Sequence, residues 1–149
     1  MLAVDPGIIH FAYVVLDVNT RAVVCGNTIS VRGATDDDEQ SVIKIVGAVR
    51  ALVDIWHPVA GCVEFQALSQ ITRGIQQATA AAMVAFGVPC SIIYPAQVKG
   101  HFAGLGCHGH AQNKKDAVKL VEQMGYGPLE NHLADAILLG LYLLETKNF

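Results

Sequence analysis

The chain has 149 residues, a formal net charge of −3 and a hydrophobic share of 52%. This length suits one domain, and the apolar share can fill a substantial core without disulfide bonds. The longest stretch without Asp, Glu, Lys or Arg runs from 74 to 98, and glutamine, glycine and proline interrupt it. A membrane-spanning helix needs about 20 consecutive, mainly apolar residues, so the composition excludes a membrane span. We therefore expect a single domain over 1–149.

The first third of the sequence predicts three strands in a meander. Residues 1–5 form a short apolar run that ends at Pro6-Gly7, a turn signal. Residues 8–16 and 22–31 are rich in Val, Ile and Tyr, and the polar residues between them are typical of a hairpin turn. Two consecutive hairpin connections indicate antiparallel pairing.

The rest of the chain alternates helical and β-rich segments. Four segments show apolar residues at the i, i+3, i+4, i+7 spacing of amphipathic helices, and two short β-rich runs separate the first three. We expect helices at 39–56, 71–86, 111–124 and about 130–145, and strands at 59–65 and 90–94. Strand–helix–strand units imply parallel pairing. The fold class is therefore α/β, with a mixed five-stranded sheet, an antiparallel meander joined to parallel strands, and helices on both faces. The pattern leaves the strand order open.

Net charge and the spacing of the cysteines exclude few classes of function. The net charge of −3 argues weakly against nucleic-acid binding, but the run Asp36–Glu39 supplies four of the acids and is expected to be a solvated loop. The four cysteines lack the paired spacing of a zinc ribbon, and no basic start precedes an apolar signal segment. We expect a reduced, intracellular protein. The mean hydropathy of +0.40 indicates a large core and a subunit interface.

Four potential metal ligands fall at places where strands and a helix can bring them together. Asp5 and Glu64 each follow an apolar strand, and His132 and Asp135 lie three apart in the last helix, so they share a face. Singly, each has an ordinary reading as a turn residue, a solvated strand end, a helix-start histidine or a buried salt-bridge partner. Together they match the oxygen ligands of Mg²⁺, with an imidazole that Mn²⁺ also accepts. Two such ions about 3.5–4 Å apart can hydrolyse a phosphodiester.

Basic residues supply candidate phosphate contacts. Lys114, Lys115 and Lys119 form a stripe in one predicted helix, which is either a solvated face or a DNA contact. Arg73, early in another helix, could hold phosphate near a helix N-terminus.

Three histidine-bearing segments are given other roles. The cluster Cys107–His110 is too tight to close a tetrahedral zinc site, and we interpret it as a loop or a DNA-facing surface. His10 and His57 are expected to be structural.

Over almost its whole length the sequence resembles the RuvC family of Holliday junction resolvases, in the ribonuclease H-like superfamily. The resemblance is carried by Leu-Ala-Val-Asp-Pro-Gly at 2–7, Val-Glu at 63–64, and Ser-Ile-Ile-Tyr-Pro-Ala-Gln-Val-Lys at 91–99. Phe-Ala-Gly-Leu-Gly at 102–106 and His-Leu-Ala-Asp-Ala-Ile at 132–137 complete it. Each motif is short, but their order and spacing in a chain of this length are fairly specific.

The resemblance implies a single RuvC-like nuclease domain that resolves four-way DNA junctions in recombination and repair by symmetric, metal-dependent phosphodiester hydrolysis. Asp5, Glu64 and Asp135 would bind metal, with two Mg²⁺ ions per active site. His132 stands where many members have Asp, and this histidine makes Mn²⁺ the alternative to Mg²⁺ as the bound metal. Family members are homodimers, and such a protein would act in the cytoplasm or nucleoid, or in a viral or organellar DNA compartment.

Lys99 and Lys114 fall near positions that the family uses for junction DNA. The family often carries an aromatic residue shortly after this Glu, placed to enter the junction. Here Phe65 is immediate and Ala67-Leu68 occupies the expected stretch, so the wedge position stays open. The alternatives are another ribonuclease H-like nuclease, acting on hybrids or transposon ends, and a non-catalytic nucleic-acid-binding relative. Actin-like and sugar-kinase ATPases are far longer and need Gly-rich phosphate loops that this sequence lacks.

Overall fold

A computed structural model describes residues 1–7, 9–33, 37–67, 69–102, 105–106, 110–127 and 129–147. Within them, strands and helices follow one another as the sequence predicts, with one added helix. The elements are β1 (Leu2–Pro6), β2 (Phe11–Leu16), β3 (Val23–Ile29), α1 (Asp38–Trp56), β4 (Gly61–Glu64), α2 (Gln70–Ala85), β5 (Cys90–Ile93), α3 (Pro95–His101), α4 (His110–Gln123) and α5 (Asn131–Thr146).

The five strands form one mixed sheet in the order β3-β2-β1-β4-β5. β1 pairs antiparallel with β2, Leu2 opposite Val15, and parallel with β4, Leu2 opposite Gly61. β4 pairs parallel with β5. The mixed sheet is therefore confirmed, and the strand order is new. β1 lies in the centre, where the antiparallel and parallel halves meet. Because β1, β4 and β5 run the same way, their carboxyl ends lie at one edge of the sheet.

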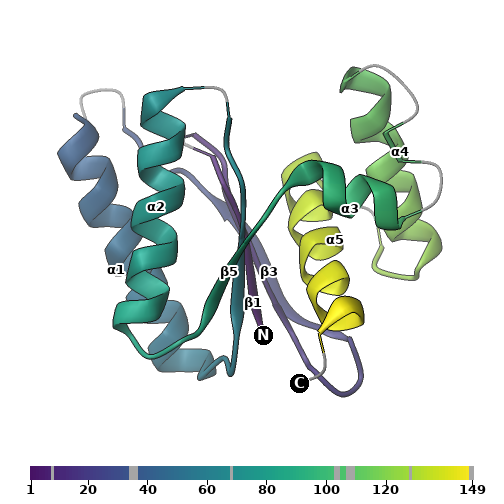
Figure 1. Cartoon of the computed structure of the whole chain (residues 1–149), viewed down its shortest axis with the longest axis horizontal. Coiled ribbons are helices and arrows are strands. Elements are labelled where there is room, and N and C mark those ends of the chain that lie inside the picture. Colours follow the sequence, from purple (N-terminus) through teal and green to yellow (C-terminus); the bar gives the residue numbers. More distant parts are fainter. Residues whose placement is uncertain are drawn as a thin grey trace.

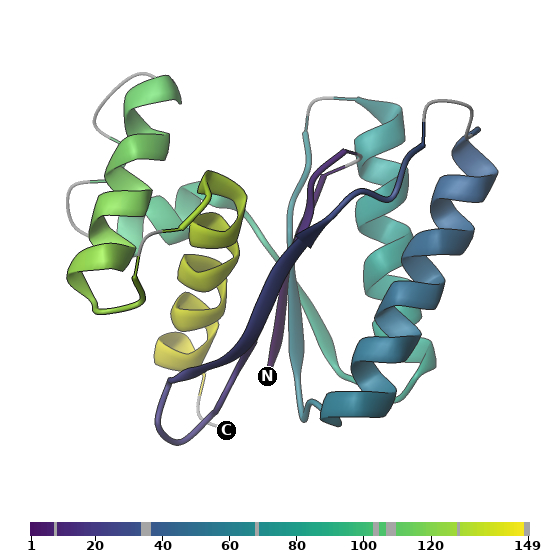
Figure 2. The ribbon, with the colours of Figure 1, turned by 180° about the vertical axis from the view of Figure 1, so that it is seen from behind.

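Helices cover both faces of the sheet, as predicted. α1 and α2 lie on one face, and α5 lies on the other with α3 and α4 beyond it (Figures 1 and 2). Side chains of β1 alternate between the two layers, as successive residues of a strand must. Leu2 and Val4 pack in the core with α1 and α2, whereas Ala3 packs in the core with α5. On β4, Cys62 packs on the α5 side and Val63 on the other.

α5 packs against the sheet at very short range. A Cβ atom added at Gly140 would lie 3.1 Å from the Cβ of Ala3 and would also meet the side chain of Leu16. The absence of a side chain at Gly140 therefore lets the helix axis approach β1 and β2 closely. α5 is apolar on most of its surface because α4 and the sheet cover different sides of it. Among the described residues, no helix is long and apolar enough to cross a membrane.

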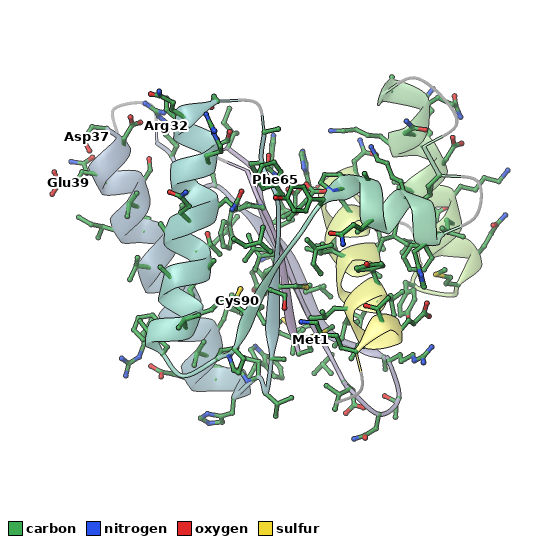
Figure 3. The ribbon with its side chains drawn as sticks, viewed as in Figure 1. Met1, Arg32, Asp37, Glu39, Phe65 and Cys90 are labelled. Atoms are coloured by element: carbon green, nitrogen blue, oxygen red, sulfur yellow. The ribbon has the colours of Figure 1, made fainter. Side chains whose placement is uncertain are left out.

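The acidic run Asp36–Glu39 was expected to be a solvated loop. Asp37, Asp38 and Glu39 are indeed exposed, but the loop assignment is wrong for Asp38 and Glu39, which lie in a helix. The Asp37 side chain accepts a hydrogen bond from the Gln40 backbone N–H and caps α1, while Asp38 and Glu39 lie in its first turn (Figure 3). Acidic groups are favourable there because the helix N-terminus carries partial positive charge and unpaired N–H groups. Asp36 lies outside the described residues.

α3 is the element that the sequence did not predict. It is a short helix in which only Val98 is buried, so it offers no apolar periodicity to recognise. Pro95 at its start reads as an interruption, but proline suits the first turn of a helix, where its missing N–H costs nothing. The fourth strand is also shorter than expected, since Val59 lies before it and is 62% exposed.

Candidate active site

Two carboxylates lie at the carboxyl ends of neighbouring parallel strands. Asp5 is the fourth residue of β1 and Glu64 the last of β4. Alternation along each strand turns both toward α5, since Ala3 and Cys62, two residues earlier, pack on that side. Asp5 is 7% exposed. The strand-end pattern in the sequence therefore predicted where these two side chains lie.

The first turns of α5 bring the other two predicted residues to the same place. The His132 Nδ1 atom lies 3.0 Å from Asp5 Oδ2, and Asp135 follows one turn along the helix. All four residues line one cavity of about 380 Å³, together with Lys99 from α3 and Lys114 from α4. Figure 3 labels Phe65, also in the cavity lining, at the end of the sheet opposite Met1. The predicted four-residue set is thus assembled in space.

The acidic groups of this cavity repel one another. Burial, followed by the charges of Asp5 and Asp135, raises the pKa of Glu64 to about 8. Burial, followed by the charge of Asp5, raises the pKa of Asp135 to about 6. The hydrogen bond with Asp5 raises the pKa of His132. A site in which two neighbouring carboxyl groups have raised pKa values is one where a cation would be strongly stabilising.

The donor chemistry fits a hard divalent ion, since the cavity offers three carboxylates and one imidazole. As the described side chains stand, no three of the His, Cys, Asp and Glu groups are placed to share one ion. Asp5 instead contacts His132 through one oxygen and Gln66 through the other. Occupation by a metal would therefore require side-chain adjustment around Asp5.

Sequence reasoning missed two polar residues at the site. The Gln66 side-chain Nε2 lies 3.4 Å from Asp5 Oδ1 and 3.1 Å from Glu64 Oε2. The His10 ring stacks on the His132 ring, with centroids 4.9 Å apart. His10 was expected to be structural, yet it lies beside the site. His10 had one signal in the sequence, its place just after the Pro6-Gly7 turn. Glycine is required at position 7 because a Cβ there would meet the His10 carbonyl.

Of the five predicted basic residues, two reach the cavity. Lys99 and Lys114 line it. Lys115, Lys119 and Arg73 are exposed and do not contribute to its lining. Of the Cys107–His110 cluster, the first three residues and the side chain of His110 lie outside what the structure describes.

Phe65, which lines the cavity, forms an aromatic pair with Tyr94. The Phe65 ring packs on the Tyr94 ring, with centroids 4.4 Å apart and a tilt of 30°. Tyr94 is 51% exposed and directly follows β5. Its proximity to Phe65 follows from the parallel pairing of Glu64 with Ile93, which the sequence did not reveal.

The mixed sheet in this order, with helices on both faces, has the ribonuclease H-like fold, and its acidic side chains lie at the ends of β1 and β4 and on the last helix. The chain is similar to the crossover junction endodeoxyribonuclease RuvC of Synechococcus sp. (strain CC9605), at 28% identity over 149 residues and 95% of each chain. No family model matches it.

Solved structures agree with this similarity. Thermus thermophilus RuvC matches with a TM-score of 0.77 and 24% identity, over 95% of this chain and 92% of that one. The Fowlpox virus resolvase, solved with its substrate Holliday junction DNA, matches with a TM-score of 0.64 and 14% identity, over 98% and 99%. The predicted fold and the predicted resemblance to RuvC are confirmed.

Proposed function

We propose that this chain is a structure-selective DNA endonuclease, one RuvC-like domain that resolves four-way junctions by metal-dependent phosphodiester hydrolysis. The observation that carries the proposal is the convergence of Asp5, Glu64, His132 and Asp135 on one cavity. The similarity to RuvC proteins supports the choice of substrate, because a protein of this fold has been solved with Holliday junction DNA.

Asp5, Glu64 and Asp135 would hold two Mg²⁺ or Mn²⁺ ions, with His132 as a fourth ligand or as a group that orients the attacking water. Bound ions of this kind activate water and stabilise the leaving oxygen of a phosphodiester. Burial and neighbouring acids raise the pKa of Glu64 to about 8 and that of Asp135 to about 6. Ligands must be deprotonated to bind metal, so metal affinity should increase with pH up to about pH 8.

Lys99 and Lys114 would contact the phosphate of the cleaved strand; what supports this is that both line the cavity that holds the carboxylates. Phosphate contacts of this kind position a nucleic acid without reading its sequence. Lys115, Lys119 and Arg73 would contact more distant phosphates, where the duplex arms leave the site.

A second copy of the chain is the partner that the exposed apolar residues favour. Ile43 on α1 and Ile71 and Val84 on α2 are 62%, 41% and 60% exposed. They lie on the helical layer that faces away from α5. A homodimer that buries them would carry two sites related by a twofold axis, which suits paired cuts on symmetry-related strands. Sedimentation at micromolar concentration tests this, and a monomer would contradict paired incision.

The decisive experiment compares cleavage of a synthetic mobile four-way junction with cleavage of linear duplex, RNA–DNA hybrid and flap, with Mg²⁺ and with Mn²⁺. We expect preferential junction cleavage that Asp5→Asn and Glu64→Gln abolish. Asp54→Asn is the control, since Asp54 lies on α1 in an exposed ion pair with Arg50. Retained cutting in the Asp5 or Glu64 variant would refute the proposal. Preferential cutting of hybrids would identify another ribonuclease H-like nuclease, and junction binding without cutting a non-catalytic relative.

A further inference from the structure

A neutral amide lies between two of the proposed metal-binding carboxylates. The Gln66 side-chain nitrogen is within hydrogen-bond distance of Asp5 Oδ1 on β1 and of Glu64 Oε2 on β4. An amide nitrogen carries two hydrogens, so Gln66 can donate one to each carboxylate. It therefore links the ends of two neighbouring strands through their acidic side chains.

The position of Gln66 is itself fixed by a buried residue of α2. Its backbone N–H donates to the Oε1 atom of Gln76 at 2.9 Å, and Gln76 is only 3% exposed. The neighbours of Gln76 on the inner face of this helix are largely apolar, among them Ile75 and Met83. A buried amide is costly there unless it is hydrogen-bonded. The bond that Gln76 makes reaches the loop that carries Gln66 and not its own helix.

Phe65, the residue before Gln66, is hydrogen-bonded to the neighbouring strand β5. The Phe65 backbone N–H donates to the carbonyl of Ile93 at 2.8 Å, which continues the pairing of β4 with β5. The segment after Glu64 is thus fastened to β5 at Phe65 and to α2 at Gln66. These two bonds hold the backbone from which the Gln66 side chain extends.

We propose that Gln66 and Gln76 are positioning residues of the metal site: Gln76 fixes the backbone of Gln66, and the Gln66 amide holds Asp5 and Glu64 in a convergent arrangement. This inference rests on the proposed function, since it takes those two carboxylates to be metal ligands. A carboxylate oxygen has more than one lone pair, so each can accept the amide hydrogen and still bind an ion. Ligating carboxylates are commonly hydrogen-bonded in this way.

If the Gln66 amide blocked the ligand oxygens, its removal would change metal affinity in the opposite direction. If the amide merely occupied ligand oxygens, removing it would free them and metal would bind more tightly. If it orients them, removing it lets the carboxylates separate under their mutual repulsion, and metal binds more weakly.

The test measures Mn²⁺ affinity of the full chain by calorimetric titration, without DNA. Gln66→Met and Gln76→Met remove the amides at similar side-chain length. Gln77→Met is the matched control, because Gln77 is the next residue of α2 and is exposed. Loss of a hydrogen-bonding partner of a metal ligand typically weakens affinity by 10–100-fold, and we expect about tenfold for each of the two variants. The Gln66→Met/Gln76→Met double variant should bind Mn²⁺ no more weakly than Gln66→Met alone, because Gln76 acts through Gln66.

A second readout separates positioning from catalysis. In junction cleavage, the Mn²⁺ concentration for half-maximal rate should rise in Gln66→Met, while the rate at saturating Mn²⁺ stays close to that of the parent. Unchanged or tighter Mn²⁺ binding in Gln66→Met would overturn the proposal, and so would losses that multiply in the double variant. If Gln76→Met lowers the folded fraction, Gln66→Met still tests the central contact, since Gln66 is only partly buried.

Asp5→Asn in the same titration distinguishes two kinds of failure. If it abolishes Mn²⁺ binding while Gln66→Met does not weaken it, the metal site stands and only the positioning role fails. If Asp5→Asn binds Mn²⁺ like the parent, the metal site itself fails, and the proposed function with it.

Discussion

Glu64→Gln should make the metal-free protein more stable while it abolishes cleavage. The carboxyl group ends β4 close to two other acids, and burial with their charges raises its pKa from 4.5 to about 8. The glutamine amide has nearly the same shape and carries no charge. The substitution therefore removes an electrostatic cost of folding and leaves the packing intact.

The magnitude follows from the pKa. At about 1.4 kcal/mol for each pKa unit, the rise corresponds to roughly 5 kcal/mol as an upper bound. Asp5 and Asp135 take part in the same repulsion, and partial solvation screens it, so we expect about 2 kcal/mol of added stability. For a domain of this size, 1 kcal/mol shifts the melting temperature by about 2–4 °C. Glu64→Gln should therefore melt about 4–8 °C higher in EDTA at pH 8.

The pH dependence has a definite sign. The folded pKa of Glu64 lies above its unfolded value, so folding is disfavoured as the unfolded carboxyl ionises. Below about pH 4.5 the parent and Glu64→Gln should differ little, and the gap should widen up to about pH 8 and then level off. Thermal melts in EDTA across this range measure it, with Glu122→Gln as an exposed control that shifts stability by less than about 0.5 kcal/mol. A variant that melts at or below the parent at pH 8 would refute the electrostatic account.

Three further predictions test other parts of the structure. Lys114→Ala should weaken junction binding and make its affinity less dependent on salt concentration. Lys119 lies outside the cavity, so Lys119→Ala should change the affinity and its salt dependence less. If binding titrations give the two variants equal salt slopes, Lys114 is an ordinary surface lysine. His132→Asp should raise the ratio of Mg²⁺- to Mn²⁺-supported cleavage, because it replaces an imidazole with an oxygen ligand; an unchanged ratio would argue against ligation at this position. Gly47→Ala should stabilise the protein by about 0.5–1 kcal/mol, because alanine favours a helix and nothing lies within 4 Å of the added Cβ. Gly140→Ala should destabilise it by about 1 kcal/mol, because its Cβ would meet Leu16 and Ala3. Chemical denaturation measures both, and equal effects would contradict the close approach of α5 to the sheet.

Residues with strong local signals were predictable from the sequence. Asp5 and Glu64 follow strands whose apolar runs are unmistakable, and the three-residue spacing of His132 and Asp135 places them on one helix face by geometry alone. The parallel and antiparallel pairings followed from connection types. These signals needed no knowledge of distant contacts.

Features that depend on long-range pairing were not predictable. The contact of Gln66 with Asp5 joins residues 61 apart in the chain, and its contact with Gln76 joins a loop to a helix. A glutamine carries no periodic or turn signal that would predict either contact. The stacking of His10 on His132 likewise depends on how α5 lies over β1. The strand order belongs to the same class, since several orders satisfy the same connections.

The packing of α5 and α4 implies different susceptibilities to local opening. α5 packs against β1, β2 and β4, whereas the main packing partner of α4 in the described chain is α5 itself. Opening α5 would break the central core, so Asp5 and Asp135 belong to the unit whose amide protons exchange with solvent only on global unfolding. α4 can separate at lower cost and carry Lys114 away from the carboxylates. The acidic groups would then keep their places on the sheet and on α5 while the cationic side of the cavity opens.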